Sequence, residues 1–187
     1  AGIAAQMTRT DHVSGSDRVM EVAELRGWSD DDVVINVQGD EPLVPPAVIN
    51  QLSDGMREHA DLSMATLSEP LHSVSEFLDP NVVKVVCNDH GLAMLFSRAP
   101  IPYPRDSQGR SLPESAARHV GIYAFRVHAL RRFTALESST LEQVEMLEQM
   151  RWLQAGHPLL VMHARKPVPG GVDTPEDLAR VREQFGT

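Results

Sequence analysis

Helical repeats of apolar residues alternate with short apolar runs along this chain. Apolar residues at helical spacing predict a helix over 14–26, which Ser14 or Ser16 can cap. The run 32–38 is apolar and β-branched, which is typical of a strand buried on both faces of a parallel sheet. A helix over about 45–55 follows, because proline is tolerated in a first helical turn.

The rest of the chain continues this alternation. The pattern predicts strands over 62–67, 82–86, 93–97, 118–126 and 159–163, and helices over 129–135, 141–155 and 175–185. The helix over 141–155 is predicted as one unbroken element, because Leu141, Val144 and Leu147 recur at helical spacing. Alternating strands and helices indicate an α/β fold, and 187 residues suit a single domain, 1–187.

The segment 98–118 interrupts the alternation. It holds four prolines together with Arg, Asp, Ser and Gly, so we expect a long loop or arm inside the domain. Loops of this length in a compact domain are usually functional or contact a partner.

Composition excludes some classes of function. The net charge is −9, from 17 basic and 26 acidic side chains, which repels nucleic acid and anionic membranes. We find no run of about 18 apolar residues and no signal-peptide pattern, so we expect no membrane span. The one cysteine, Cys87, lies in an apolar run and favours a buried structural thiol in a reducing cytoplasm.

The first candidate site is Gly39-Asp40, at the end of the predicted strand over 32–38. Ligands of open α/β sheets bind outside the carboxyl ends of strands, and glycine allows close approach to the backbone. Asp40 can hold a magnesium ion, which usually takes one or two carboxylates plus phosphate oxygens. An acidic turn that caps the next helix explains the same residues equally well.

A second acidic turn contains Asp173. Asp173 or Thr174 fits a helix N-cap and Pro175 fits the first helical position, so a structural role is a strong alternative. The flexible pair Gly170-Gly171 beside this turn favours a functional role. Asp40 and Asp173 together would make a two-carboxylate magnesium site.

Two further groups of polar residues carry weaker signals. Ser14 and Gly15 at a helix start can present backbone N–H groups to a base or phosphate, and Arg9 and Arg18 can bind a carbonyl or an anion. A solvated loop with a helix cap is the alternative. The other group consists of Arg98, Arg118, His119, Tyr123, Glu142 and Glu145. Taken alone, each of these residues is more typical of packing or of a solvated face.

Taken in order, the motifs closely resemble the 3-deoxy-manno-octulosonate cytidylyltransferase (CMP-Kdo synthetase) family of Gram-negative bacteria. The segments that carry the resemblance are 7–18, 35–42, 79–86, 96–102, 119–123, 141–149 and 171–178. They extend through essentially the whole chain.

The resemblance implies a Rossmann-type mixed sheet flanked by helices, as in nucleotide-diphospho-sugar transferases, with a hairpin or arm insertion. It implies transfer of CMP from CTP to the sugar acid Kdo in the cytoplasm, for lipopolysaccharide biosynthesis, by a homodimer with magnesium. Asp40 and Asp173 match the family's metal-binding acids. The nucleotide-binding residues it implies are Arg9, Ser14, Gly15, Arg18, Gly39 and Asp40. The sugar-acid-binding residues it implies are Gln38, Arg98, His119, Tyr123, Glu142 and Glu145.

One part of the family pattern has no match. The family begins with a strand and a Gly-, Arg- and Lys-containing loop that grips the triphosphate, whereas this chain starts at Ala1-Gly2 without an initiator Met. We therefore expect a sequence that lacks the N-terminal segment. The alternatives are a cytidylyltransferase for sialic acid or amino-modified Kdo, a truncated non-catalytic nucleotide-binding or dimerising domain, and a metal-dependent phosphatase.

Overall fold

The structure is a computed structural model that describes residues 2, 4–172 and 174–185. Its helices are α1 Gly15–Arg26, α2 Pro46–Glu58, α3 Val74–Leu78, α4 Val127–Ala135, α5 Thr140–Glu145, α6 Gln149–Gln154 and α7 Pro175–Phe185. Its strands are β1 Val33–Asn36, β2 Met64–Pro70, β3 Lys84–Cys87, β4 Ala93–Ser97, β5 Ala117–Arg126 and β6 Leu160–His163.

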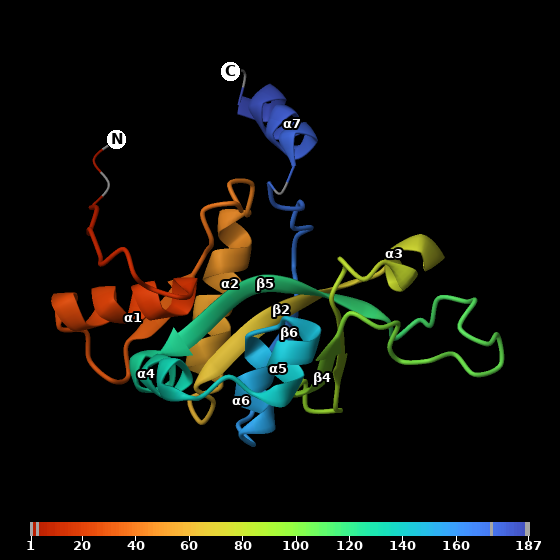
Figure 1. Cartoon of the computed structure of the whole chain (residues 1–187), viewed down its shortest axis with the longest axis horizontal. Helices are drawn as coiled ribbons and strands as arrows, with labels where there is room; N and C mark the ends of the chain where they lie inside the picture. Colours follow the sequence, from red (N-terminus) through yellow and green to blue (C-terminus); the bar gives the residue numbers. More distant parts are fainter. Residues whose placement is uncertain (1, 3, 173, 186–187) are drawn as a thin grey trace.

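Within the described residues, these strands form one mixed sheet around β5 (Figure 1). β2 pairs along one edge of β5 and is followed by β6. The other edge of β5 pairs with β3 at Ala117 and Arg118, and with β1 from Tyr123 to Arg126. β1 and β2 both run antiparallel to β5, and β6 runs parallel to β2, so the carboxyl ends of β1, β2 and β6 point the same way.

Helices cover both faces of the sheet, and each face has its own apolar core. Helix α2 covers one face, where Val48, Leu52 and Met56 pack against β2 and β5. Helices α1, α4 and α6 contribute to the core on the opposite face, together with Phe125. Successive β5 residues alternate between the two cores, because strand side chains point to opposite faces in turn. This three-layer arrangement confirms the predicted mixed α/β fold.

Most predicted elements are present, and two corrections are needed. β3 and β4 form the predicted hairpin, and Ser14 caps α1 as predicted. The strand over 32–38 was predicted for a parallel sheet with both faces buried, but β1 pairs antiparallel with β5, and Val34 is its buried residue. Because β5 continues past the end of β3, its free edge is available to β1.

The predicted helix over 141–155 is wrong. Helix α5 ends at Met146, which has a left-handed φ of 54°, and α6 begins three residues later. The break turns the chain so that Leu147 and Met150 reach the core, whereas Val144 stays 81% exposed. A straight helix would have aligned these residues on one stripe, and tertiary packing overrides that pattern. Helix α3 was not predicted.

The proline-rich segment is a loop up to Ala116, and β5 begins at Ala117. It projects from the sheet at the right of Figure 1. Within it, Gly109 has a φ of +81° and lies under the Tyr103 ring, where an added Cβ would come within 3.0 Å. Among the described residues, no helix is long and apolar enough to cross a membrane.

A buried lysine on β3 forms hydrogen bonds with the segments that flank the β3–β4 hairpin. Lys84 on β3 is 0% exposed, and its Nζ donates to the carbonyl oxygens of Asp79 at 2.8 Å, Val82 at 2.6 Å and Arg98 at 2.6 Å. Burial lowers the pKa of the Lys84 ammonium, and these carbonyl dipoles replace the lost water.

We predict that Lys84→Met lowers the free energy of unfolding by about 3 kcal/mol, since a buried acceptor left without its donor costs about 1–3 kcal/mol. Urea denaturation measures the change. Lys166→Met is the matched control, because Lys166 is exposed. Equal stability of the two variants would contradict the role given to the buried ammonium.

Candidate functional site

A cleft opens beside β5 at the carboxyl end of β1, and we call it the β5 cleft. Its volume is about 220 Å³, and it is lined by Gln38, His119, Gly121, Tyr123, Met146, Leu147, Glu148 and Gln149. His119 and Tyr123 alternate with core residues on β5, and Gln38 follows the end of β1. The structure therefore brings together three of the predicted sugar-acid residues: Gln38, His119 and Tyr123.

The His119 ring contacts two aromatic rings and one hydroxyl group. Its ring meets the edge of Phe96, with centroids 4.9 Å apart, and lies 5.3 Å from the Tyr123 ring. Its Nε2 lies 3.0 Å from the Thr66 hydroxyl. Burial, and secondarily the Arg118 cation, lower the pKa of His119 to about 3. The imidazole is therefore neutral near pH 7.

Tyr123 adds a hydroxyl group to the same cleft. Burial, and secondarily the charge of Glu148, raise the pKa of Tyr123 well above its ordinary value. The phenol therefore keeps its proton near neutral pH and can donate a hydrogen bond. Within the described part of the chain, its hydroxyl group has no hydrogen-bond partner, and it is not sealed inside the protein.

The structure adds Glu148 and Gln149, which sequence reasoning missed. Gln149 is 4% exposed, and its Nε2 is a buried amide nitrogen without a hydrogen-bond partner among the described residues. Such a group costs free energy in the protein, because its donor has lost water without gaining an acceptor. Glu148 lines the same cleft, and partial burial raises the pKa of its carboxyl group.

Glu142 and Glu145 were predicted to face the ligand, but the structure gives them protein partners. Glu142 forms a capping box with Ser139 and a buried ion pair with Arg151. Glu145 accepts from the Ser97 hydroxyl at 2.6 Å and from the Arg98 backbone N–H at 2.9 Å. Neither glutamate lines the β5 cleft. The unbroken-helix prediction missed Glu148 and Gln149 because it omitted the turn at Met146.

Arg98 also lies in the wall behind the cleft. Its Nε donates to the Glu145 carbonyl at 2.7 Å, and its Nη1 donates to the Pro80 carbonyl at 2.9 Å. Arg98 thereby ties the hairpin to the end of α5. In this structure its guanidinium group is not a lining group of the β5 cleft.

Asp40 is exposed just beyond β1, next to Gly39. The Val172 N–H donates to the Asp40 carbonyl oxygen at 2.8 Å, so the segment before residue 173 lies against Asp40. Gly171 permits this contact, because an added Cβ would come within 3.0 Å of that oxygen. Asp173 itself lies outside the described residues. Thr174 caps the following helix, as one alternative predicted.

The exposed Asp40 carboxylate has the donor chemistry of a magnesium ligand, since this ion takes one or two carboxylates and completes its shell with phosphate and water oxygens. Within residues 2, 4–172 and 174–185, no cluster of three or more His, Cys, Asp or Glu side chains forms a metal cage.

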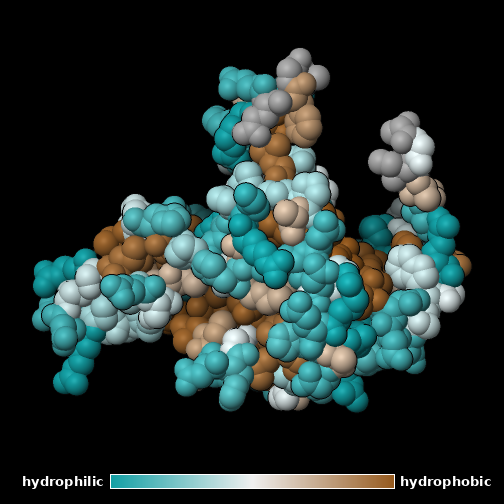
Figure 2. All heavy atoms as spheres, turned by 180° about the vertical axis from the view of Figure 1, so that it is seen from behind, coloured by the Kyte–Doolittle hydropathy of each residue, from teal (hydrophilic) through white to brown (hydrophobic). Residues whose placement is uncertain are grey.

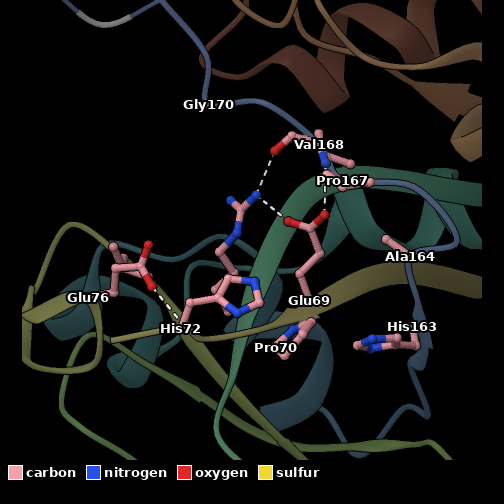
Figure 3. Close-up of a pocket in the computed structure, with 11 residues that line it drawn as sticks. Glu69, Pro70, His72, Glu76, His163, Ala164, Pro167, Val168 and Gly170 are labelled. Carbon is pink, nitrogen blue, oxygen red and sulfur yellow. Dashed lines mark hydrogen bonds and ion pairs between the residues drawn. The ribbon is translucent and has the colours of Figure 1, made fainter. Parts of the chain in front are cut away.

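Two further clefts continue the β5 cleft along the strand. A cleft of about 290 Å³ shares His119 and Gly121 with it and adds Glu41 and Arg118. Arg118 also lines the next cleft, of about 570 Å³, which Figure 3 shows. There Arg118 pairs with Glu69 and donates to the Val168 carbonyl at 2.6 Å. This buried pair anchors the chain that leads from β6 towards Gly171.

The predicted nucleotide segment lies at the start of α1. The Ser14 hydroxyl accepts from the Asp17 N–H at 3.2 Å as the helix cap. Gly15 lies near the end of β1, where an added Cβ would be 3.9 Å from the Asn36 amide. Arg9 pairs with Asp11 at 2.8 Å, and Arg18 donates to the Arg9 carbonyl at 3.0 Å. This segment thus borders the same edge of the sheet as Asp40.

Known proteins resemble this chain over nearly its whole length. A family model described as cytidylyltransferase matches residues 1–163. The chain is 49% identical to 3-deoxy-manno-octulosonate cytidylyltransferase of Cellvibrio japonicus, over 97% of this chain and 73% of that protein. It is 46% identical to the enzyme of the same name from Alcanivorax borkumensis, over 96% of this chain and 73% of that protein.

A solved structure agrees with these relatives. CMP:2-keto-3-deoxy-manno-octonic acid synthetase in complex with CTP superposes with a TM-score of 0.89 at 40% identity. The match covers 99% of this chain and 73% of that one.

We predict that Gln149→Met raises the free energy of unfolding by about 1 kcal/mol, since methionine has a similar shape and removes an unsatisfied buried amide. Thermal or urea unfolding of the ligand-free protein measures the change. Gln51→Met is the matched control. Gln51 is 5% exposed, but its amide donates to the His163 carbonyl at 2.7 Å and accepts from the Arg165 N–H at 2.9 Å.

The control variant should therefore lose stability while Gln149→Met gains it. A loss of similar size in both variants would mean that the Gln149 amide is satisfied within the protein.

Proposed function

We infer the function of this chain from its family. The chain belongs to the cytidylyltransferase family. This confirms the family resemblance that the sequence predicted. It transfers CMP from CTP to 3-deoxy-manno-octulosonate (Kdo) and releases pyrophosphate. The relatives named for this reaction match nearly the whole chain, and the similar solved structure contains CTP.

The observation that carries this proposal is the composition of the β5 cleft. Kdo is a sugar acid, so its pocket needs hydrogen-bond donors for a carboxylate and polar groups for several hydroxyls. The protonated Tyr123 phenol is a neutral donor that suits a carboxylate, and Gln149 lines the same cleft. Gln38 and the neutral His119 suit the hydroxyl groups. These donors offset the repulsion that a chain of net charge −9 exerts on an anion.

In this proposal the chain acts by positioning both substrates. The β5 cleft holds the sugar acid so that its anomeric hydroxyl points towards the end of β1. The start of α1, with Ser14 and Gly15, and the side chains of Arg9 and Arg18 bind the nucleotide at the same edge. The hydroxyl attacks the α-phosphate of CTP, and the bond to pyrophosphate breaks. Orientation of the two reactants in one site supplies much of the rate.

We assign magnesium as the cofactor, with Asp40 as a ligand and Asp173 as the second carboxylate. When bound, the ion stabilises negative charge on the transferring phosphoryl group and on the leaving pyrophosphate. The contact between Val172 and Asp40 supports the pairing, because it brings the chain next to residue 173 against Asp40. Gly39 leaves room for phosphate, because a Cβ added there would meet nothing within 4 Å.

The proposal extends to assembly and location. We assign the enzyme to the cytoplasm and to lipopolysaccharide biosynthesis, and we propose a homodimer in which the loop 98–116 contacts the second copy. Apolar surface supports an interface: Tyr103 in this loop is 62% exposed, and Met94 on β4 is 63% exposed. Figure 2 shows apolar areas that reach the surface on the face seen from behind the view of Figure 1.

We predict that Asp40→Asn lowers turnover of CTP and Kdo at least about 100-fold, because metal stabilisation is worth several kcal/mol and 1.36 kcal/mol is a factor of ten. Pyrophosphate release with magnesium measures turnover. Asp54→Asn is the control, since Asp54 lies on α2 and pairs with Arg57 at the surface.

Three further arms test the competing functions. Faster turnover with sialic acid than with Kdo would identify sialic acid as the preferred substrate. Phosphate-ester hydrolysis without CTP would indicate a phosphatase. No pyrophosphate release from the unaltered chain, or undiminished release from Asp40→Asn, would contradict the proposal.

We predict that the chain sediments as a dimer at micromolar concentration and that Tyr103→Glu shifts it towards monomer. A buried charge without a partner disfavours an apolar interface. Analytical ultracentrifugation measures the shift, with Asp54→Asn again as control. A monomeric unaltered chain would contradict the proposed assembly.

A further inference from the structure

Thr66 on β2 has a buried hydroxyl that faces an irregular part of β5. Between the pairs Ala65–Ala124 and Leu67–Val120, β2 has one residue and β5 has three. This bulge frees backbone carbonyls from the regular ladder. The Thr66 hydroxyl fills the gap, lying 3.0 Å from the Val120 carbonyl oxygen and 2.8 Å from the Ile122 carbonyl oxygen.

The same hydroxyl also touches His119, whose Nε2 lies 3.0 Å away. A hydroxyl has one proton to donate and two lone pairs that accept. Both carbonyl oxygens are acceptors only, so the proton of Thr66 must point to one of them. If the Thr66 proton pointed to His119 instead, both buried carbonyl oxygens would face only the lone pairs of the Thr66 oxygen, which repel them. The third neighbour, Nε2 of His119, is therefore the donor.

This assignment leaves Nδ1 of His119 without a proton. A neutral imidazole carries one N–H and one bare nitrogen, and the partner of one nitrogen decides the state of the other. Within the described residues, Nδ1 has no hydrogen-bond partner and is not sealed inside the protein. His119 lines both the β5 cleft and the neighbouring cleft of about 290 Å³. The bare nitrogen therefore remains available to a molecule bound there.

We propose that Thr66 is a positioning residue, which fixes His119 as the Nε2–H tautomer so that Nδ1 accepts a hydrogen bond from a hydroxyl group of the bound sugar acid. This inference rests on the proposed function and deepens it. The low pKa of His119 agrees with the geometry, because a ring that stays neutral keeps Nδ1 as an acceptor.

The tautomer constrains how the sugar acid lies. A bare nitrogen attracts an O–H group and repels a carboxylate oxygen, which brings lone pairs and negative charge. The carboxylate must therefore turn away from His119 within the cleft. Thr66 thus acts on substrate orientation without touching the substrate.

The first test is spectroscopic and needs no substrate. ¹⁵N chemical shifts of the His119 ring distinguish a protonated from a bare nitrogen. We expect a proton on Nε2 and a bare Nδ1 in the ligand-free chain at pH 7. A proton on Nδ1, or on both nitrogens, would overturn the proposal whether or not the protein binds Kdo.

The second test compares Thr66→Val, which lacks the hydroxyl, with Thr66→Ser, which keeps it. We expect the Thr66→Val ring to lose its single tautomer and Kdo binding to weaken roughly 5- to 10-fold, the value of one neutral hydrogen bond. Thr66→Ser should retain both properties of the unaltered chain. Isothermal titration calorimetry with Kdo measures the affinity, and ring ¹⁵N shifts are recorded on the same samples.

An unchanged tautomer and affinity in Thr66→Val would overturn the positioning role. If Thr66→Val fails to fold, the unaltered chain and Thr66→Ser still decide the tautomer. If the unaltered chain binds no Kdo, the proposed function fails, and the ring shifts separately decide whether Thr66 sets the tautomer.

Discussion

The backbone pairing of β5 supports both the sheet and the cleft. One edge of this strand pairs with β2, and its other edge pairs with β3 and then with β1. On this second edge, β3 pairs with Ala117 and Arg118, and β1 pairs with the residues from Tyr123 to Arg126. The stretch of β5 around Gly121 lies between these two pairings. The β5 cleft opens at this position. The same discontinuity that interrupts the ladder therefore creates the space for a ligand.

The polar side chains of the site are supported by bonds to backbone carbonyls. Lys84 and Arg98 together hold the hairpin, its flanking loop and the end of α5. Arg118 and Glu69 hold the chain that returns to Asp40. Lys84 and Glu69 are buried, so each must keep its partners or lose free energy. Together these hydrogen bonds and ion pairs connect the segments that surround the cleft.

Local sequence predicted the elements well, because their signals lie in neighbouring residues. The α1 cap at Ser14, the β3–β4 hairpin and the strand that leads to Asp40 are examples. The prediction failed where distant packing decides the structure. Leu141 and Leu147 fit one helical stripe, yet only the second is buried. The unbroken helix also gave no reason to expect Glu148 and Gln149 at the β5 cleft, which the turn at Met146 places there.

The family motifs named Gln38, His119 and Tyr123, which line one cleft in the structure, whereas periodicity alone would have left them as packing residues. The role of Thr66 could not be found from the chain at all, because it depends on the bulge between β2 and β5.

The left-handed residue Met146 has a consequence for how such a pocket changes over evolution. Helix α6 starts directly after the turn, and each residue added or removed there rotates the helix by about 100°. A single insertion would replace Gln149 at the cleft with a neighbouring side chain and withdraw Met150 from the core. Length changes in this turn are therefore costly, whereas a point substitution at 148 or 149 keeps the register of α6. New substrate preferences are accordingly more accessible through substitution than through insertion.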